Sequence, residues 1–383
     1  MKIDQKTGIL GGGQLGKMLA LAAGKWHLPL WALDADANFP AAPYVPRFVE
    51  GDFKNKEDVL AFGREVDVLT IEIEHVNIEA LHQLEAEGKR IHPRPGALEI
   101  IKDKGRQKQF FADHDFPTAP FTVFEDEKAL LRAVEAGEVA FPFVQKTTTA
   151  GYDGRGVSII RSVEDLETRL LEGTCLAEEL APIDKELAVI AARNERGELA
   201  AFPAVEMVFN PDANLVELLL CPAQISPAVE AAAENLAKAV IEAFDICGLL
   251  AVELFLTKNG EIWVNEVAPR PHNSGHHTIE ACVTSQFEQH LRGVLNWPLG
   301  STELVRPAAM VNLLGAEGYE GAPVFEGLEE CLRTPGVYVH NYGKTTTKPF
   351  RKMGHVTVVG KTVQEVLHKA HWVKDHLRVI AAS

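Results

Sequence analysis

The chain has 383 residues, 46% of them hydrophobic, and its 38 Lys and Arg against 54 Asp and Glu give a formal net charge of −16. This length predicts two or three domains with sizeable cores, and the acidic balance argues against nucleic acid as a partner, because non-specific binding needs clustered cations. We expect a cytoplasmic protein without a membrane partner, since no apolar run could span a bilayer, the N-terminus has no signal-peptide layout, and the five cysteines are widely spaced.

The first hundred residues alternate predicted strands and helices. Strands at 7–10 and 28–34 flank a helix that begins at Gln14, and the apolar run 66–73 precedes a helical pattern at 78–87. Strands separated by helices predict a parallel, doubly wound sheet of the Rossmann-like α/β class.

A glycine-rich turn, Gly11–Gly16, fits the pattern G-x-G-x-x-G between the first strand and the first helix. Asp34 ends the next strand, near the position of a ribose-binding acid, so a nicotinamide oxidoreductase is one interpretation. Any phosphate can bind the free amides of a helix N-terminus. Another phosphate-bearing ligand, or a purely structural turn, therefore stays open.

The middle of the chain mixes helices and strands. Helical patterns cover 101–114 and 226–244, and strands are predicted at 143–149 and 157–160. In the second helix, Ser226 is a suitable N-cap and is followed by Pro227 at the first helical position.

The last segment offers short strands at 337–342 and 355–359 and an amphipathic helix at 363–376. Segment 92–96, which contains two prolines, is a candidate domain boundary. We expect an N-terminal domain at 1–100, a middle domain at 101–300 and a small, β-rich C-terminal domain at 301–383.

The stretch between the two middle strands carries three glycines in six positions, after Lys146. Glycines let backbone amides approach phosphate oxygens and let a loop open and close. A phosphate-binding lid is thus favoured over an ordinary hairpin loop. Further on, Glu178–Ala181 and Glu186 are consistent with a nucleotide-binding strand edge or with a solvated one.

Asn259-Gly260 separates two apolar strands and is a strong hairpin signal. If these two residues form a type I′ turn, Lys258 faces Glu261, and Glu253 lies directly opposite Glu266 with Cβ atoms roughly 5 Å apart. Two such carboxylates repel unless a cation lies between them. Mg²⁺, which combines carboxylate and phosphate oxygens, is the natural candidate.

The hairpin leads into a polar loop, Ala268–His277, that is typical of a site. Its histidines, His272, His276 and His277, also leave zinc open as an alternative. Near the C-terminus, Arg351 and Lys352 are either a substrate-binding pair or a solvated one.

Five motifs together resemble the ATP-grasp superfamily, and within it the N5-carboxyaminoimidazole ribonucleotide synthetases of purine biosynthesis: GGGQLGKML, DKGRQKQFFADHDFPTAPF, KTTTAGYDGRG, VNEVAPRPHNSGHHT and RKMGH. The resemblance covers nearly the whole chain. It implies an ATP-grasp fold with a lid at about 118–187, between a Rossmann-like and a C-terminal domain. It also implies ATP-dependent carboxylation of aminoimidazole ribonucleotide by bicarbonate via carboxyphosphate, with Mg²⁺, in a homodimer.

Residue roles follow from the same resemblance. Arg270, Lys352, Tyr152 and Arg155 would be catalytic, and Glu253 and Glu266 would bind Mg²⁺. The ribonucleotide would contact Gly13, Gln14, Leu15, Glu74, Tyr152, Arg155, His272, Asn273, Lys344, Arg351 and Lys352. ATP would contact Lys104, Lys146, Gly151, Tyr152, Asp153, Gly154, Arg155, Gly156, Val157, Glu178, Glu179, Leu180, Ala181, Glu186, Phe209, Asn265 and Glu266.

Two residues depart from the family pattern: Lys104 replaces an arginine, and Phe209 replaces a frequent histidine. A lysine can pair with phosphate but not bidentately. A formate-dependent glycinamide ribonucleotide ligase, a biotin carboxylase and a non-catalytic nucleotide-binding subunit are the remaining alternatives.

Overall fold

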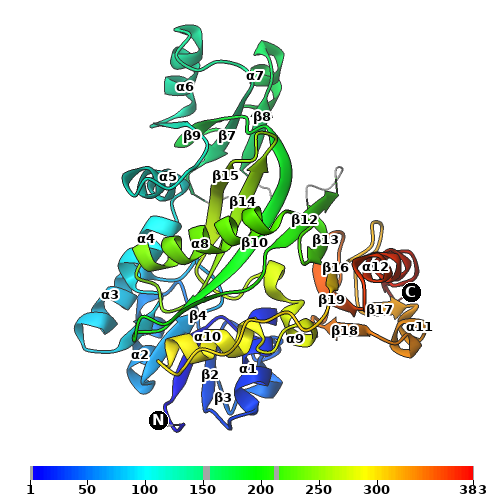
Figure 1. Ribbon diagram of the computed structural model, residues 1–383. Helices are drawn as coiled ribbons and strands as arrows, with labels where there is room; N and C mark the ends of the chain where they lie inside the picture. Colours follow the sequence, from blue (N-terminus) through cyan, green and yellow to red (C-terminus); the bar gives the residue numbers. More distant parts are fainter. Residues whose placement is uncertain (1–2, 150–155, 211–214, 383) are drawn as a thin grey trace.

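The computed structural model describes residues 3–149, 156–210 and 215–382 (Figure 1). Its N-terminal region is a five-stranded parallel sheet in the order β3-β2-β1-β4-β5, as predicted. The strands are β1 (Thr7–Leu10), β2 (Leu30–Asp34), β3 (Arg47–Glu50), β4 (Val68–Ile71) and β5 (Arg90–His92), and the helices are α1 (Gln14–Gly24), η1 (Ala42–Tyr44), α2 (Lys56–Glu65) and α3 (Ile78–Ala86).

The strand order of this sheet reverses between β1 and β4. Ligands of open parallel sheets bind beyond the carboxyl ends of the strands at such a reversal. The segments that follow β1 and β4, which begin at Gly11 and Glu72, therefore meet where a ligand is expected.

Two helices, α4 (Pro95–Ile101) and α5 (Lys104–Asp113), replace the single helix predicted at 101–114. Asp103 interrupts it, because its backbone is extended (φ −114°, ψ 113°) and its carboxylate caps α5 by accepting the amide of Arg106. The predicted helix is thus confirmed over 104–113, and only its start was placed wrongly, because a capping side chain competes with helix continuation. The break leaves Lys104 in the first turn of α5.

A small antiparallel sheet follows at one end of the molecule, opposite the N-terminal region (Figure 1). Its strand order is β6-β9-β7-β8. The strands are β6 (Phe121–Phe124), β7 (Phe143–Thr147), β8 (Val157–Ile160) and β9 (Cys175–Glu179), and α6 (Glu127–Glu135) and α7 (Val163–Arg169) accompany them.

A nine-stranded sheet joins the middle and C-terminal segments. It runs β15-β14-β10-β12-β13-β16-β19-β18, with β11 beside β10. The pairing of β13 with β16 carries it from one segment into the other. Its strands are β10 (Ile183–Arg193), β11 (Leu199–Ala201), β12 (Val205–Asn210), β13 (Leu215–Cys221), β14 (Gly248–Thr257), β15 (Ile262–Ala268), β16 (Ala308–Leu314), β18 (Val337–Asn341) and β19 (Lys352–Val359).

The remaining elements cover this sheet or close its ends. Helix α8 (Pro227–Ala243) begins at the predicted cap, Ser226, and buries Ala233, Ala237 and Val240 against β10 and β14. The others are η2 (Asn273–Gly275), α9 (Thr278–Ala281), α10 (Gln286–Val294), β17 (Pro323–Glu326), α11 (Leu328–Arg333), α12 (Val363–His376) and β20 (Arg378–Ala381). No helix in the described ranges has the length and apolar character to cross a membrane.

Candidate active site

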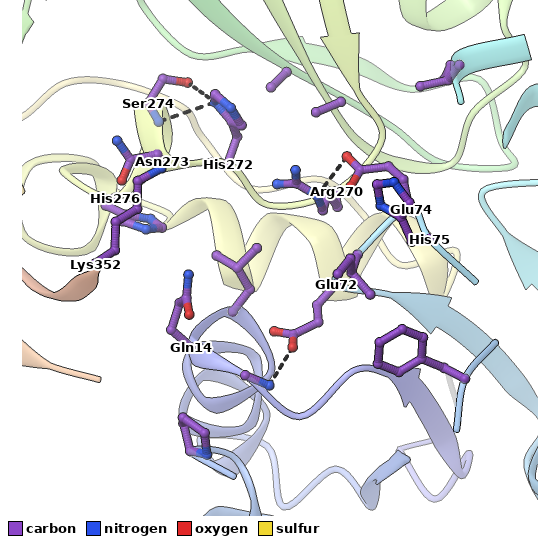
Figure 2. A pocket seen from close by; sticks show the side chains of 18 of the residues that line it. Gln14, Glu72, Glu74, His75, Arg270, His272, Asn273, Ser274, His276 and Lys352 are labelled. Atoms are coloured by element: carbon purple, nitrogen blue, oxygen red, sulfur yellow. Dashed lines mark hydrogen bonds and ion pairs between the residues drawn. The ribbon is translucent and has the colours of Figure 1, made fainter. Parts of the chain in front are cut away.

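A cavity of about 990 Å³ lies where the N-terminal sheet, the nine-stranded sheet and the C-terminal segment meet (Figure 2). Its walls come from parts of the chain more than 300 residues apart, from Gly13 to Lys352. Among its lining residues are these predicted site residues: Gly13, Gln14, Leu15, Glu74, Lys104, Glu253, Glu266, Arg270, His272, Asn273, Lys344, Arg351 and Lys352.

Most of the other predicted residues lie on the small sheet or beside it, whereas Glu186, Phe209 and Asn265 belong to strands of the nine-stranded sheet. Lys146 and Glu178 lie on β7 and β9, and Glu186 lies on β10. Gly156 and Val157 open β8, Glu179 ends β9, Leu180 and Ala181 connect β9 to β10, and Phe209 belongs to β12. The predicted lid residues Gly151, Tyr152, Asp153, Gly154 and Arg155 lie outside the described residues.

The predicted pairing of Glu253 with Glu266 is confirmed, although the predicted turn is wrong. Near the turn, Leu256 pairs with Ile262, one residue away from the predicted register. The turn contains three residues, 258–260, because the amide of Thr257 donates to Glu261 O and the amide of Gly260 donates to Thr257 O. Lys258 therefore does not face Glu261, and only Gly260 of the Asn-Gly pair has positive φ, at 83°.

A β-bulge restores the register at the site. Leu254 pairs with Val264 but Glu253 pairs with Glu266, so Asn265 is the extra residue. A bulge re-aims side chains on the bulged strand. Lys146 Nζ donates to Asn265 Oδ1 at 2.9 Å, and Lys104 Nζ donates to Glu266 Oε2 at 2.7 Å. The adjacent residues Asn265 and Glu266 of β15 thus each accept a hydrogen bond from one lysine.

The paired glutamates have unequal surroundings. Burial, together with the neighbouring Glu266 and Glu186, raises the pKa of Glu253. Burial also opposes ionisation of Glu266, but the charge and hydrogen bond of Lys104 outweigh it and lower the pKa of Glu266. When no cation is added, the pair is therefore more stable with one carboxyl group ionised than with both.

Glu178 is almost fully buried, with 2% of its side chain exposed, between two lysines. Lys146 Nζ lies 2.8 Å from Glu178 Oε2 and Lys108 Nζ lies 3.1 Å from Glu178 Oε1. Burial raises the pKa of this carboxyl, but the two ammonium groups bring it below its usual range. Sequence reasoning missed Lys108, although it lies four residues after Lys104 and hence on the same helix face.

The glycine-rich turn is occupied by side chains of the protein itself. The amides of Gly13 and Gly16 donate to the two carboxylate oxygens of Glu72, and Gly12 N donates to Asp34 Oδ2 at 2.7 Å. A diphosphate would need the same amides. This arrangement counts against the nicotinamide interpretation, which considered Asp34 only as a ribose ligand and did not consider Glu72.

Arg270 is held in the cavity wall by an acidic partner. Its Nε lies 2.8 Å from Glu74 Oε1, and Figure 2 shows the two side chains pointing toward one another. The pair joins the loop after β15 to the loop after β4. The two residues were predicted separately, one as catalytic and the other as substrate-binding.

The histidines of the polar loop bond within the protein. His272 Nδ1 lies 2.9 Å from Ser274 Oγ, His276 Nδ1 lies 2.9 Å from Gln286 Nε2, and His277 Nδ1 lies 3.1 Å from Ser274 O. Burial lowers the pKa of His277 to about 4. Within the described ranges, no three His, Cys, Asp or Glu side chains gather in a metal-binding group, so this loop gives zinc no support.

A cationic group reaches the cavity from the C-terminal segment. Lys344, Arg351 and Lys352 all line it. Lys344 Nζ donates to Lys352 O at 2.7 Å, and the guanidinium of Arg351 donates to Thr346 O at 2.7 Å. These bonds to backbone oxygens orient the side chains of Lys344 and Arg351.

Comparisons with known proteins agree with this geometry. The ATP-grasp domain family matches residues 109–287, the ribonucleotide synthetase preATP-grasp domain family matches 4–102, and the phosphoribosylaminoimidazole carboxylase C-terminal domain family matches 308–369. The phosphoribosylaminoimidazole carboxylase of Candida glabrata is 39% identical over 95% of this chain, which spans 65% of that relative's length.

Relatives of similar length also match. The N5-carboxyaminoimidazole ribonucleotide synthase of Bacillus subtilis is 35% identical over 94% of both chains. The solved structure of N5-carboxyaminoimidazole ribonucleotide synthetase from Thermotoga maritima has a TM-score of 0.91 at 45% identity, covering 99% of this chain and 100% of that one.

A further solved structure comes from Aspergillus clavatus, an N5-carboxyaminoimidazole synthase in complex with ADP and 5-aminoimidazole ribonucleotide. It matches with a TM-score of 0.90 at 33% identity, over 98% of this chain and 99% of that one. Identity at this level over nearly full length shows common descent as well as a common fold. The chain therefore belongs to the family of N5-carboxyaminoimidazole ribonucleotide synthetases within the ATP-grasp superfamily.

Proposed function

We propose that this protein carboxylates 5-aminoimidazole ribonucleotide with bicarbonate, cleaving ATP to ADP and phosphate, in de novo purine biosynthesis. One observation carries the proposal. A single cavity is lined both by the paired carboxylates with Lys104 and by the cations Lys344, Arg351 and Lys352 of the C-terminal segment. Such a cavity suits two phosphate-bearing substrates bound together.

On the nucleotide side, we assign the phosphates of ATP to Lys104, Lys146 and the glycine-rich lid. Lys146 is 9% exposed and is held by both Glu178 and Asn265, so its ammonium group is fixed in place. A pre-positioned charge stabilises phosphoryl transfer without reorganising during the reaction. Glu178–Ala181 and Glu186 then border the nucleotide at the edge of the small sheet.

Glu253 and Glu266 fit a magnesium site. Two carboxylates facing each other across a hairpin, completed by phosphate oxygens, are the donor set that Mg²⁺ takes at ATP sites. When bound, the ion supplies positive charge that offsets the developing charge on the phosphates. Lys104 already compensates Glu266, so the ion would share this carboxylate with the lysine rather than be the sole counter-charge.

The remaining wall residues would carry out the carboxylation. A bicarbonate oxygen attacks the γ-phosphorus as the bond to ADP breaks, which forms carboxyphosphate. The exocyclic amine then attacks the carboxyl carbon, either of carboxyphosphate with phosphate as the leaving group or of the CO₂ formed when carboxyphosphate loses phosphate, and the amine gives up a proton. Arg270, oriented by Glu74, offers a fixed cation for the carboxyl oxygens. His272 and Lys352 line the same cavity and would contact the ribonucleotide.

The ribonucleotide phosphate would bind between the glycine-rich turn and the C-terminal cations. Gly13, Gln14 and Leu15 line the same cavity as Lys344 and Arg351. The family also implies a homodimer, which we propose here and which sedimentation across a range of protein concentrations would test.

The direct test is ADP release with each substrate varied separately. We expect release only when aminoimidazole ribonucleotide and bicarbonate are both present, with formation of the carboxylated ribonucleotide. Glycinamide ribonucleotide with formate is the matched control and should give no release. Equal turnover with this control pair would instead assign the protein to the sister ligase.

A further inference from the structure

The glycine-rich turn binds a carboxyl group that belongs to the chain itself. Glu72 follows β4 and its carboxylate accepts the amides of Gly13 and Gly16, at the start of α1 (Figure 2). The strand order reverses between β1 and β4, which brings the two segments together. The carboxylate thus lies where the dipole of α1 favours a negative charge.

The glycines of the turn fit this carboxylate closely. A Cβ atom added to Gly13 would lie 2.8 Å from Glu72 Oε1, and one added to Gly16 would lie 3.3 Å from Glu72 Oε2 and 3.0 Å from Gly11 O. Gly11 has a φ of 109°, and a side chain there would also collide with Glu72. The G-x-G-x-x-G spacing therefore accommodates an internal side chain.

The charges around Glu72 come from three elements. Burial, and to a smaller extent Asp34 at the end of β2, raises the pKa of Glu72 to about 7, against the amides of Gly13 and Gly16 and the charge of Arg270 in the loop after β15, which favour the carboxylate. Arg270 is itself paired with Glu74, two residues after Glu72. The glycine-rich turn is thus joined to the cavity wall that contains the proposed carboxylation residues.

We propose that Glu72 is the resident hydrogen-bond acceptor of the glycine-rich turn. It takes the amides that a diphosphate would use and holds the turn in the shape that presents Gln14 and Leu15 to the ribonucleotide. Gln14 and Leu15 line the cavity, and the first amides of a helix have no partner within the helix, so these two residues offer donors to the ribonucleotide under this proposal. Glu72 is therefore a positioning residue, and its effect on substrate binding rests on the proposed function.

The kinetic test uses Glu72→Gln, which keeps the size of the side chain but replaces one acceptor oxygen by a donor. We expect the Michaelis constant for the ribonucleotide to rise about ten-fold or more while that for ATP barely changes. Glu79→Gln, an exposed glutamate on α3, is the matched control and should behave like the wild type. Equal losses for ATP and the ribonucleotide, or no loss, would overturn the positioning role.

Chemical rescue separates positioning from general structural damage. Glu72→Ala removes the atoms of one acetate ion, so added acetate should restore the ribonucleotide Michaelis constant in this variant. The same acetate should not rescue Glu72→Gln, whose side chain fills the space. Failure of acetate to rescue an otherwise folded Glu72→Ala would contradict the proposal.

A substrate-free measurement keeps this inference separate from the proposed function. Amide hydrogen exchange at Gly13 and Gly16 should be faster in both variants than in the wild type, and acetate should slow it in Glu72→Ala. Unchanged exchange would reject the anchoring role even if carboxylation is observed. Altered exchange in a protein without carboxylase activity would reject the function and retain the anchor.

Discussion

At the scale of single residues, the two paired glutamates differ in whether an oppositely charged side chain of the protein lies beside them. Glu266 has Lys104 at 2.7 Å, whereas the pKa of Glu253 is raised by burial and by neighbouring carboxylates. The expectation that only Mg²⁺ relieves the repulsion between them was therefore incomplete. The two residues should respond differently to the same substitution.

Glu253→Gln and Glu266→Gln should each reduce ADP release at least about a hundred-fold, because each removes a ligand for the ion that opposes phosphate charge. Thermal unfolding without Mg²⁺ should tell them apart. Glu253→Gln should be as stable as the wild type, whereas Glu266→Gln should lose about 1–2 kcal/mol by leaving Lys104 without its charged partner. Near-normal turnover in either variant would exclude this metal site.

Glu186 provides a pH-dependent prediction. Burial raises the pKa of Glu186 to about 7, against the opposing charge of Lys146, so the folded state binds a proton more tightly than the unfolded state. The associated stability is complete below the unfolded pKa, near 4.5, and is lost as the pH rises to 7. Relative to Glu186→Gln, the wild type should lose roughly 1–3 kcal/mol between these pH values. Parallel pH profiles of unfolding free energy would contradict this.

At the scale of elements, short irregularities aim the site residues. The break at Asp103 places Lys104 at the start of α5, and the bulge at Asn265 presents two adjacent side chains to two lysines. The lid strands β7 and β8 pair through Lys146 and Val157, which border the glycine-rich stretch. Ligand-dependent order is therefore expected between these two residues.

Saturating Mg-ATP should protect amides between Lys146 and Val157 from hydrogen exchange, since phosphate contacts order a glycine-rich loop. NADH is the control ligand. It should not protect Gly11–Gly16, because Glu72 and Asp34 already accept amides there. Unchanged lid exchange with ATP bound would refute the lid, and protection of the turn by NADH would revive the oxidoreductase interpretation.

At the scale of the whole molecule, the nine-stranded sheet carries the C-terminal cations to the cavity. β13 pairs with β16 and β16 with β19, so Lys352 at the start of β19 reaches the same cavity as Glu253 on β14. We therefore expect binding of the ribonucleotide to depend on the C-terminal cations and binding of ATP to depend on the lid and the hairpin.

Lys352→Ala should lower the catalytic efficiency with the ribonucleotide about ten- to a hundred-fold, because a charged hydrogen bond is lost. The Michaelis constant for ATP should barely move. Lys348→Ala, an exposed lysine of the same segment, is the matched control and should resemble the wild type. Equal losses for both substrates would assign Lys352 to the fold or the lid instead.

The sequence alone determined the features that depend on local chemistry. Ser226 and Pro227 marked the start of α8, alternating strands and helices indicated the parallel sheet, and the glycine in Asn259-Gly260 located the hairpin. The family resemblance pointed to residues that do line the cavity, among them Glu266, Arg270 and Lys352. These signals are readable because caps, turns and periodicity act between residues close in sequence.

Only the tertiary structure decided which polar groups far apart in the sequence form hydrogen bonds or ion pairs with one another. The turn of three residues and the bulge at Asn265 shift the hairpin register in opposite directions, so the correct pairing of Glu253 with Glu266 rested on two deviations that cancel. Glu72 fills the glycine-rich turn because the strand order places β4 beside β1, and Lys108 shares Glu178 because α5 packs against β9. A buried polar group needs some partner, but which one it meets depends on packing that no local pattern encodes.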